Sequence, residues 1–374
     1  GNVGSALAGV LILRSTGAGV STVANQPFST AADYSLTIIP LFIVMGVFAV
    51  RAGLAQAAFD LATSAFRRLP GGPALASLAG SGMFAAVTGS SVATVATMAR
   101  VSTDAIVRAG YSIRLAAGVV CAGGTLGVLI PPSIVLVLYG VVTEESIGQL
   151  LIAGIGPGLL TIAVYAVTIV ALVAWQRRRV ADRDLVQVGT GSGSATGEFA
   201  EEASEPIGRD ITGFLYLVVI FAVSVGTIYL GVATPTEAAS FGAFAALIIL
   251  LLRSRPSAWL RNIEESLREA VGLTAMTFLL MVGAGVFTYV LALSGASTSL
   301  VNAVTAADLP PYVVLIACLA VLLPLGMFLD GISMILIAAP LLHPILTGYG
   351  FDGIWIGVLI VKVAEMALIT PPVG

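Results

Sequence analysis

Residues 121–133 read CAGGTLGVLIPPS and lie within one of the most apolar parts of the chain. Apolar segments of this kind normally form helices, yet this one contains three glycines and two adjacent prolines. Proline removes a backbone donor and frees an upstream carbonyl, and glycine lets the chain turn sharply. In a membrane, irregular backbone is tolerated only where it is buried in protein or lines a wet cavity. The stretch therefore predicts a broken helix. One such break is commonly a kink or a site of close packing, whereas several breaks placed symmetrically indicate a site for a polar ligand.

The composition is that of an integral membrane protein. Of the 374 residues, 58% are hydrophobic and 10% are charged, whereas soluble domains carry about 25% charged residues. The mean hydropathy is +1.04, and several apolar runs reach the roughly 20 helical residues that cross a bilayer. These runs lack the alternation of barrel strands. The net charge of −3 gives no reason to expect a nucleic-acid partner, and Cys121 and Cys318 are expected to be buried thiols.

Matches at a shared offset indicate an internal repeat. Pro131-Pro132 recurs as Pro371-Pro372, an offset of 240 residues, and Leu69-Pro70 meets Leu309-Pro310 at the same offset. The first copy is rich in arginine, whereas the second has Lys362 as its single Lys or Arg. Since these residues collect in cytoplasmic loops, the two copies are expected to cross the membrane in opposite directions. We therefore predict an all-α integral membrane protein built from inverted-topology repeats.

The same reading divides the chain into six parts. Both ends look cut, so we expect a fragment that lacks part of a first helix and a segment after the last one. The parts are a truncated first helix and periplasmic loop (1–34), repeat 1 with a scaffold helix, surface helix, hairpin and broken helix (35–146), a connecting transmembrane helix (147–176), a cytoplasmic linker (177–210), two transmembrane helices with an amphipathic surface helix at 256–270 (211–270), and repeat 2 with a second hairpin, a second broken helix and a truncated C-terminus (271–374).

Each copy contains two predicted interruptions, at 88–91 and 123–133 in the first and at 329–333 and 365–374 in the second. Segments 73–109 and 312–346 are predicted to be re-entrant hairpins that turn at the first interruption of each copy. Freed carbonyls and negative helix ends suit Na⁺, and positive helix N-termini suit a carboxylate. The hydroxyls that can join them are those of Ser90, Ser91, Thr125, Ser133, Ser333 and Thr370.

Two acidic residues in the apolar runs of the second copy are candidates for function, because charges at bilayer depth are costly. They are Asp330, at the predicted hairpin turn, and Glu365. The alternatives are a helix-end cap or an ion pair, and Glu365 can pair with Lys362 at i, i+3. Asp330 has no obvious local partner, so its loss is expected to impair function more than the loss of Glu365. The single histidine, His343, has no second ligand nearby and predicts a packing or capping role.

Several motifs together resemble the large membrane subunit of tripartite ATP-independent periplasmic (TRAP) transporters. They are IPLFIVMGVF (39–48), AAVTGSSVATVATM (85–98), GGTLGVLIPPSIVLVLYG (123–140), GVATPTEAAS (231–240), GMFLDGISMILIAAPLLHPIL (326–346) and ALITPPVG (367–374). The resemblance covers nearly the whole chain in order, and the LGxLIPPS and GMFLDG motifs are fairly specific. The linker at 180–209 falls outside it.

The resemblance implies a multi-pass protein of the bacterial inner membrane. Such subunits use a Na⁺ gradient to import small organic acids, such as C4-dicarboxylates or sialic acid, by an elevator movement. A periplasmic substrate-binding protein delivers the acid, and a small membrane subunit packs against the large one. A single-component divalent-anion/Na⁺ symporter of similar architecture is the alternative. A membrane-embedded enzyme is the alternative of another class, although HExxH, GxSxG and intramembrane Asp or His pairs at catalytic spacing are absent from the sequence.

The resemblance also implies residues for two coupling-ion sites and a substrate site. Substrate is expected between the two hairpin turns near Ser133 and Asp330, with the Thr125 hydroxyl as a further contact. The second ion site is the less secure, because Ala364-Glu365 stands where the first copy has Gly124-Thr125. The first Na⁺ site is expected at Gly89, Ser90, Ser91, Gly124, Val128 and Pro131, and the second at Gly331, Ser333, Thr370 and Pro371.

Overall fold

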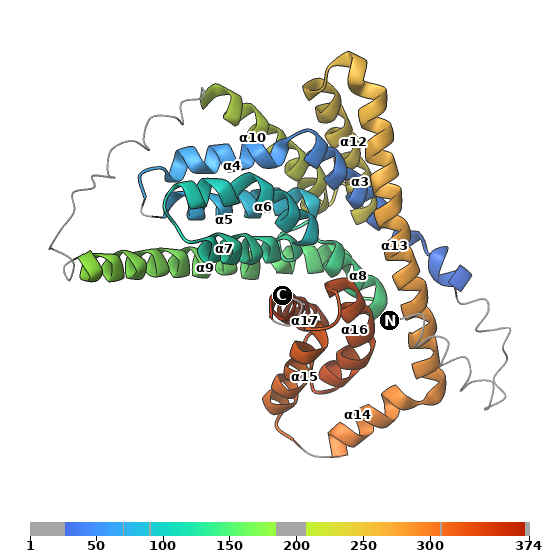
Figure 1. Cartoon of the computed structure of the whole chain (residues 1–374). Helices are drawn as coiled ribbons and strands as arrows, with labels where there is room; N and C mark the ends of the chain where they lie inside the picture. The colour runs from blue at the N-terminus through green and yellow to red at the C-terminus, as the bar shows by residue number, and fades with distance from the viewer. Residues whose placement is uncertain (1–26, 70, 90, 185–206, 307–308, 371–374) are drawn as a thin grey trace.

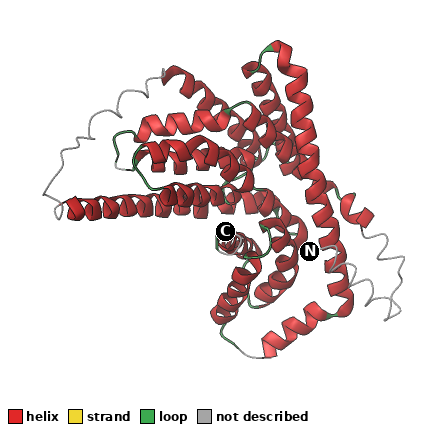
Figure 2. Cartoon of the chain, viewed as in Figure 1, coloured by secondary structure: helices red, strands yellow, loops and turns green. Residues whose placement is uncertain are grey.

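The computed structural model describes residues 27–69, 71–89, 91–184, 207–306 and 309–370. Within these residues the regular structure is entirely helical, as Figure 2 shows, so the all-α prediction is confirmed. Six helical segments of the described chain are long and apolar enough to cross a membrane. They are Tyr34–Arg51, Ile147–Trp175, Ile211–Tyr229, Pro235–Arg253, Pro256–Ser294 and Gly331–Gly348.

Where the connections are described, the helices follow one another closely. In chain order they are η1 (Tyr34–Thr37), α3 (Ile38–Arg51), α4 (Leu54–Phe66), α5 (Gly72–Thr88), α6 (Ser91–Arg108), α7 (Ile113–Gly124), η2 (Thr125–Val128), α8 (Ile134–Thr143), α9 (Ile147–Asp184), α10 (Ile207–Phe221), the π-helical turn η3 (Ala222–Gly226), α11 (Thr227–Tyr229), α12 (Pro235–Arg253), η4 (Pro256–Ala258), α13 (Trp259–Ser294), α14 (Ala296–Ala306), α15 (Pro311–Gly326), α16 (Gly331–Gly348) and α17 (Gly353–Leu368).

The backbone repeats itself at the offset that the sequence indicates. Gly53 and Gly295, which follow α3 and α13, have φ angles of 72° and 66°. Gly110 and Gly350, which follow α6 and α16, have φ angles of 84° and 87°. Because side chains other than that of glycine rarely adopt these left-handed angles, each pair fixes a turn at the same place. The helix order α3 to α7 thus recurs in α13 to α17.

The helices of the two copies form separate groups that contact each other along a central interface. This interface, here called the seam, lies between α8, α9 and η2 on one side and α16 and α17 on the other. Figure 1 shows α4 to α7 and α9 lying alongside one another and α14 to α17 grouped below them, with α8 between the groups. Helix α16 contacts α8, and α17 contacts both α9 and η2. The largest buried core includes residues of α3, α8, α16 and α17, so it joins the two copies. The broken segment of the first copy lies in this seam.

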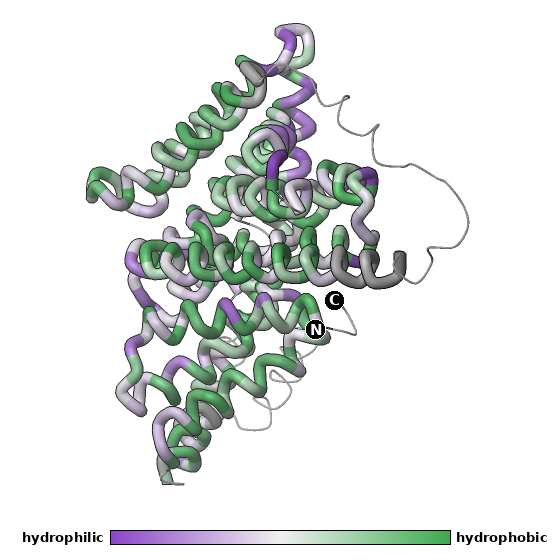
Figure 3. Tube along the Cα trace, turned by 90° about the vertical axis from the view of Figure 1, so that its left-hand side faces the viewer, coloured by the Kyte–Doolittle hydropathy of each residue, from purple (hydrophilic) through white to green (hydrophobic). Residues whose placement is uncertain are grey.

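The outer surface is apolar, as expected of helices that face lipid. On α9, Leu160 and Val167 are 66% and 69% exposed, and Leu159 and Val164 lie on the same open surface. Hydrophobic positions dominate the helices in Figure 3. Exposed apolar area of this extent would be a liability in water, and it is the ordinary condition of a transmembrane helix.

Three features differ from the sequence predictions. Helix α13 is continuous from Trp259 to Ser294, so 256–270 is not a separate surface helix. Its charged first part lies against α3, where Arg51 contacts Glu265 at 2.6 Å and Glu269 at 3.2 Å. Helix α9 extends to residue 184, within the predicted linker. Cys121 is exposed, so its predicted burial is wrong. The predicted first helix within 1–26 and the linker segment 185–206 lie outside the described residues.

Candidate functional site

The turn between α5 and α6 is buried inside the protein. Gly89 caps α5 with a φ of 59°, and its N–H donates to the Ala85 carbonyl at 3.0 Å. The Gly89 carbonyl accepts from the N–H of Ile134 at 3.4 Å. A Cβ at Gly89 would collide with the Pro132 carbonyl oxygen. Since turns between helices normally lie on the surface, a buried turn packed against the Pro-Pro segment is unusual. The break predicted at Gly89 is present.

The helix predicted to break at 123–133 also does so. Helix α7 ends at Gly124, a 3₁₀ turn follows, and α8 starts at Ile134. Ser133 is fully buried, and its hydroxyl caps α8 by accepting from the N–H of Leu136 at 3.1 Å. The Thr125 hydroxyl donates to the Ala122 carbonyl at 2.8 Å. Two of the three side chains predicted to contact substrate, Ser133 and Thr125, therefore stabilise the break itself.

The described residues predicted for the first ion site come together around this break. The Cβ position of Gly124 lies 3.3 Å from the Ser91 carbonyl oxygen, so only a glycine lets α6 approach so closely. Val128 and Pro131 are buried on the same broken segment. Ser90 lies outside the described residues. The arrangement therefore places several backbone oxygens of α6 and the broken helix in one small volume.

The second break has a different character. Asp330 caps α16, and its Oδ2 accepts from the N–H of Ser333 at 3.2 Å. The Asp330 side chain is exposed, and Phe328 in the same turn is 74% exposed. These contacts favour the helix-cap alternative for Asp330 over a role at a buried site. They also show that, unlike the first turn, the second one is open to its surroundings.

The remaining residues of the predicted second ion site lie near the end of α17. The Cβ position of Gly331 is 3.2 Å from Leu368 Cδ1, and Ser333 is 5% exposed. The Thr370 hydroxyl donates to the Met366 carbonyl at 2.9 Å. Pro371 lies outside the described residues. The start of α16 and the end of α17 are thus in contact, as the repeat predicts.

Glu365 connects the two breaks. It is 1% exposed, and the Ser91 hydroxyl donates to its Oε1 at 2.9 Å. The same Oε1 lies 3.5 Å from the Cβ position of Gly331. Its other oxygen, Oε2, is buried and has no hydrogen-bond partner among the described residues. A carboxylate with one free oxygen, held between two helix starts, is an arrangement that can receive a cation.

The ion pair between Lys362 and Glu365, which the sequence left open as an alternative, is not formed. The Lys362 Nζ is buried without a hydrogen-bond partner among the described residues, and it lies 5.4 Å from the centre of the Tyr165 ring. The hydroxyl of Tyr165 is 3.4 Å from that of Thr125. One helix thus carries two buried opposite charges that do not bond to each other. From the sequence, Asp330 is the stronger candidate for a functional carboxylate. The contact of Glu365 with Ser91 joins residues 274 positions apart, so no neighbouring residue in the sequence indicates it.

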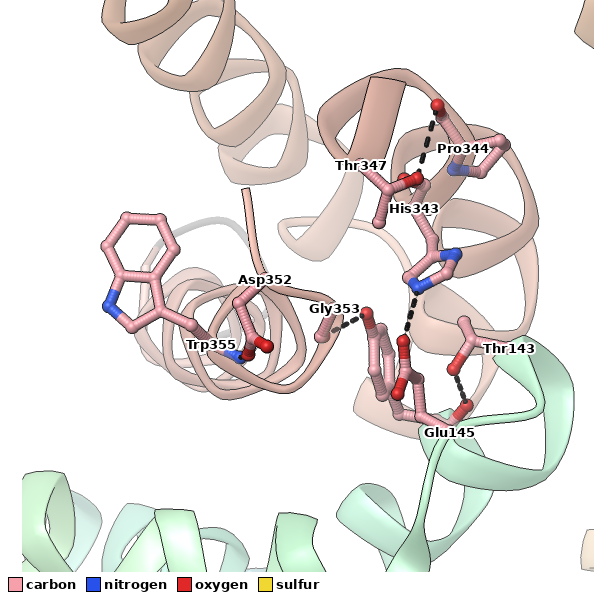
Figure 4. A network of polar contacts seen from close by, with 9 residues as sticks. Thr143, Glu145, His343, Pro344, Thr347, Asp352, Gly353 and Trp355 are labelled. Carbon is pink, nitrogen blue, oxygen red and sulfur yellow. Dashed lines mark hydrogen bonds and ion pairs between the residues drawn. The ribbon is translucent and has the colours of Figure 1, made fainter. Parts of the chain in front are cut away.

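A polar network closes one end of the seam between the copies (Figure 4). His343 Nε2 lies 3.1 Å from Glu145 Oε1, and the Tyr139 hydroxyl donates to the Gly353 carbonyl at 2.9 Å. Tyr139 is fully buried, and Asp352 beside it caps α17. The network links the end of α8 to α16 and α17. His343 therefore has a packing and pairing role, as its isolation in the sequence predicts.

Comparison with known proteins agrees with these features. A family model described as the DctM component of tripartite ATP-independent periplasmic transporters matches residues 3–374. The C4-dicarboxylate TRAP transporter large permease protein DctM of Pseudomonas aeruginosa is 36% identical over 355 residues, which are 95% of this chain and 79% of that protein. The isethionate TRAP transporter permease protein DctMQ of Oleidesulfovibrio alaskensis is 31% identical over 95% of this chain, which spans about half, 53%, of that relative.

A solved structure shares the fold. The YdaH transporter of Alcanivorax borkumensis superposes with a TM-score of 0.63 over 96% of this chain and 79% of that one. The sequences are 14% identical, so the likeness concerns the fold alone. It is the fold of an integral membrane transporter.

Proposed function

The chain belongs to the DctM family of TRAP transporter large permeases, and from this premise we propose that it imports a small organic acid together with Na⁺. Family and apolar helices identify a multi-pass inner-membrane protein that transports rather than catalyses. The coupling ion, the substrate class, the partners and the elevator movement belong to the proposal. The observation that carries it is the contact between Ser91 and Glu365.

That contact supports a re-entrant first hairpin. Glu365 is the thirteenth residue of α17, which at 1.5 Å per residue places it about 18 Å from the start of the helix. The hydrocarbon core of a bilayer is about 30 Å thick. Ser91 begins α6, and its hydroxyl reaches this carboxylate. With the start of α17 at the membrane surface, the turn at Gly89 would lie near the middle of the membrane, as a re-entrant hairpin requires.

The same contact supports Na⁺ as the coupling ion. Oxygen ligands suit a hard cation, and the seam offers the carbonyls of Gly89 and Ser91, the Ser91 hydroxyl and the free Oε2 of Glu365. Glu365 extends the first ion site and touches the second at Gly331. A bound Na⁺ would offset a buried negative charge that otherwise has one hydrogen bond.

The relatives support a substrate that carries an anionic oxygen group. One is named for C4-dicarboxylates and the other for isethionate, which is a sulfonate. We propose that a periplasmic binding protein delivers such an acid and that a small membrane subunit packs against the apolar outer surface. The hairpins and broken helices would move together against α3, α12 and α13. The alternative, a single-component symporter, would transport without either partner.

The proposal is tested by uptake into proteoliposomes. The vesicles contain this permease and its small subunit, and the binding protein is added outside with radiolabelled succinate, isethionate or N-acetylneuraminate. We expect one acid to accumulate when Na⁺ is higher outside, and not when K⁺ replaces it. Equal uptake under both cations would refute the coupling. Uptake that persists without the binding protein and the small subunit would favour the single-component symporter.

A pair of variants tests the site itself. Glu365→Gln removes the buried carboxylate between the hairpins, so Na⁺-driven uptake is expected to fall at least about tenfold, as for the loss of a charged ligand. Asp330→Asn keeps an N-cap acceptor at an exposed position, so uptake is expected to change less than about threefold. This order reverses the one expected from the sequence. A larger loss in the Asp330 variant would restore Asp330 as the principal acidic residue.

A further inference from the structure

Lys362 is the only lysine in the 374 residues. It lies in α17, one helical turn before Glu365. Its Nζ is buried and has no hydrogen-bond partner among the described residues. Long cationic side chains at membrane depth normally extend to the interface and keep their charge hydrated. Here the ammonium points inward instead, onto the ring of Tyr165 at 5.4 Å from its centre.

The surroundings compensate the charge of Lys362 only in part, because its Nζ has no hydrogen-bond partner among the described residues. A buried ammonium needs hydrogen-bond acceptors or an opposite charge, and an aromatic face replaces only a part of the lost hydration. Glu365 lies one helical turn away, but its Oε1 accepts a hydrogen bond from the Ser91 hydroxyl and neither of its oxygens bonds to the lysine. The ammonium therefore keeps its donors available for an anion that enters the seam.

Tyr165, the aromatic neighbour of Lys362, also lines a cavity. It has a volume of about 690 Å³ and lies between α7 and α9, with Tyr165 and Ala122 on its wall. This volume is within the range of small-molecule sites. Arg114 and Trp175 also line it, and Arg114 lies near the start of α7, among the arginines predicted to face the cytoplasm. The cavity thus connects the aromatic neighbour of Lys362 with a second cationic side chain.

We propose that Lys362 binds the anionic oxygen group of the transported acid. This rests on the proposed function and adds a residue that receives the substrate. Tyr165 holds the ammonium in place, and the cavity that Tyr165 lines carries a second cationic side chain, Arg114, on its wall. The carboxylate or sulfonate supplies the acceptors that Lys362 lacks, while Na⁺ occupies the oxygens around Glu365. Each buried charge on α17 then gains its own counter-ion when both cargoes are bound.

The first test is the rate of Na⁺-driven uptake at limiting concentrations of the loaded binding protein. Lys362→Gln is expected to lower kcat/KM about 10- to 100-fold, the range for the loss of a hydrogen bond to a charged group. Lys362→Arg, which keeps the charge, is expected to retain more of the activity. Arg261→Gln, at an exposed position of α13, is the control for a lost positive charge. An unchanged kcat/KM in the glutamine variant would overturn the assignment while the wild-type uptake upholds the proposed function.

The second test uses the wild-type chain, so it does not depend on whether a Lys362 variant folds. Lysine labelled with ¹³C at Cε gives this chain one lysine side-chain signal, provided that the partners are unlabelled. In phosphatidylcholine vesicles, the acid that the wild type transports is expected to shift this signal saturably. The uncharged amide of the same acid is expected to leave the signal unchanged. An unmoved signal in protein that transports the acid would refute the proposal. A shift that requires anionic lipid instead of the acid would assign the lysine to a lipid headgroup and would also refute it.

Discussion

The bond between Ser91 and Glu365 is the most consequential contact in the seam, and its removal has a calculable effect. Ser91→Ala deletes the single hydrogen bond of a side chain that is 1% exposed. A hydrogen bond to a charged group contributes about 1.5–3 kcal/mol, against about 1 kcal/mol for a neutral one. We therefore expect the Ser91 variant to lower the free energy of unfolding by about 2–3 kcal/mol, because the carboxylate stays buried without a partner.

A double-mutant cycle separates the charge from the packing. Glu365→Gln keeps an acceptor for Ser91 and removes the buried charge, so its free energy of unfolding is expected within about 1 kcal/mol of the wild type. In the glutamine background, Ser91→Ala then loses a neutral hydrogen bond, which gives a coupling energy of about 1–2 kcal/mol between the two sites. Uptake and stability are thus expected to change in opposite order, since the glutamine variant keeps its stability while its uptake falls at least about tenfold.

The assay is denaturant titration in detergent micelles, followed by tryptophan fluorescence and fitted for the free energy of unfolding. Ser77→Ala is the matched control, because Ser77 forms a buried neutral bond of 2.8 Å with Ser102 between α5 and α6. Its loss is expected to cost about 1 kcal/mol. If the Ser91 and Ser77 variants lose the same stability, or if Glu365→Gln leaves the cost of Ser91→Ala unchanged, the charged contact between the copies is refuted.

Three further predictions concern the turns and the links between helices. Gly89→Ala is expected to lose transport and more stability than Gly110→Ala, because both glycines have positive φ but only a Cβ at Gly89 collides with backbone; equal uptake by the two variants would contradict this. His343→Ala is expected to cost about 1 kcal/mol, with little additional loss when Glu145→Gln is combined with it, as measured by the same titration. Arg51→Ala is expected to cost less than about 1 kcal/mol and to lose its effect in high salt, because its contacts with α13 are partly exposed; a salt-independent loss would indicate a packing role instead.

The breaks in the helices could be predicted because glycine and proline residues at the breaks themselves cause them. Glycine and proline at 89, 123–124 and 131–132 change the backbone wherever they occur, and the structure breaks at each of these places. The repeat was likewise visible, since the turn glycines at 53 and 295 share an offset close to that of the Pro-Pro pairs. Local chemistry is sufficient for features of this kind.

The partners of the charged residues could not be predicted, because tertiary contacts decide them. Asp330 and Glu365 look alike in the sequence, as acidic residues within apolar runs. The first has a donor three residues away and becomes a cap, while the second bonds across the seam to the other copy. The continuity of α13 has the same origin, since Arg51 holds its charged first part against α3. The spacing of residues in the sequence does not predict contacts between positions so far apart.

The difference between the two copies has a consequence for coupling. At the offset of 240, Thr125 of the first copy corresponds to Glu365 of the second. The Thr125 hydroxyl donates to the Ala122 carbonyl of its own helix, whereas the Glu365 carboxylate accepts from Ser91 of the other copy. Two identical copies would present two equivalent neutral sites. The substitution instead places one negative charge on the seam, one turn away from an unpaired ammonium on the same helix. If Na⁺ binds at Glu365 and the acid at Lys362, as proposed, the two opposite charges attract each other across one helical turn, so each is expected to favour the binding of the other.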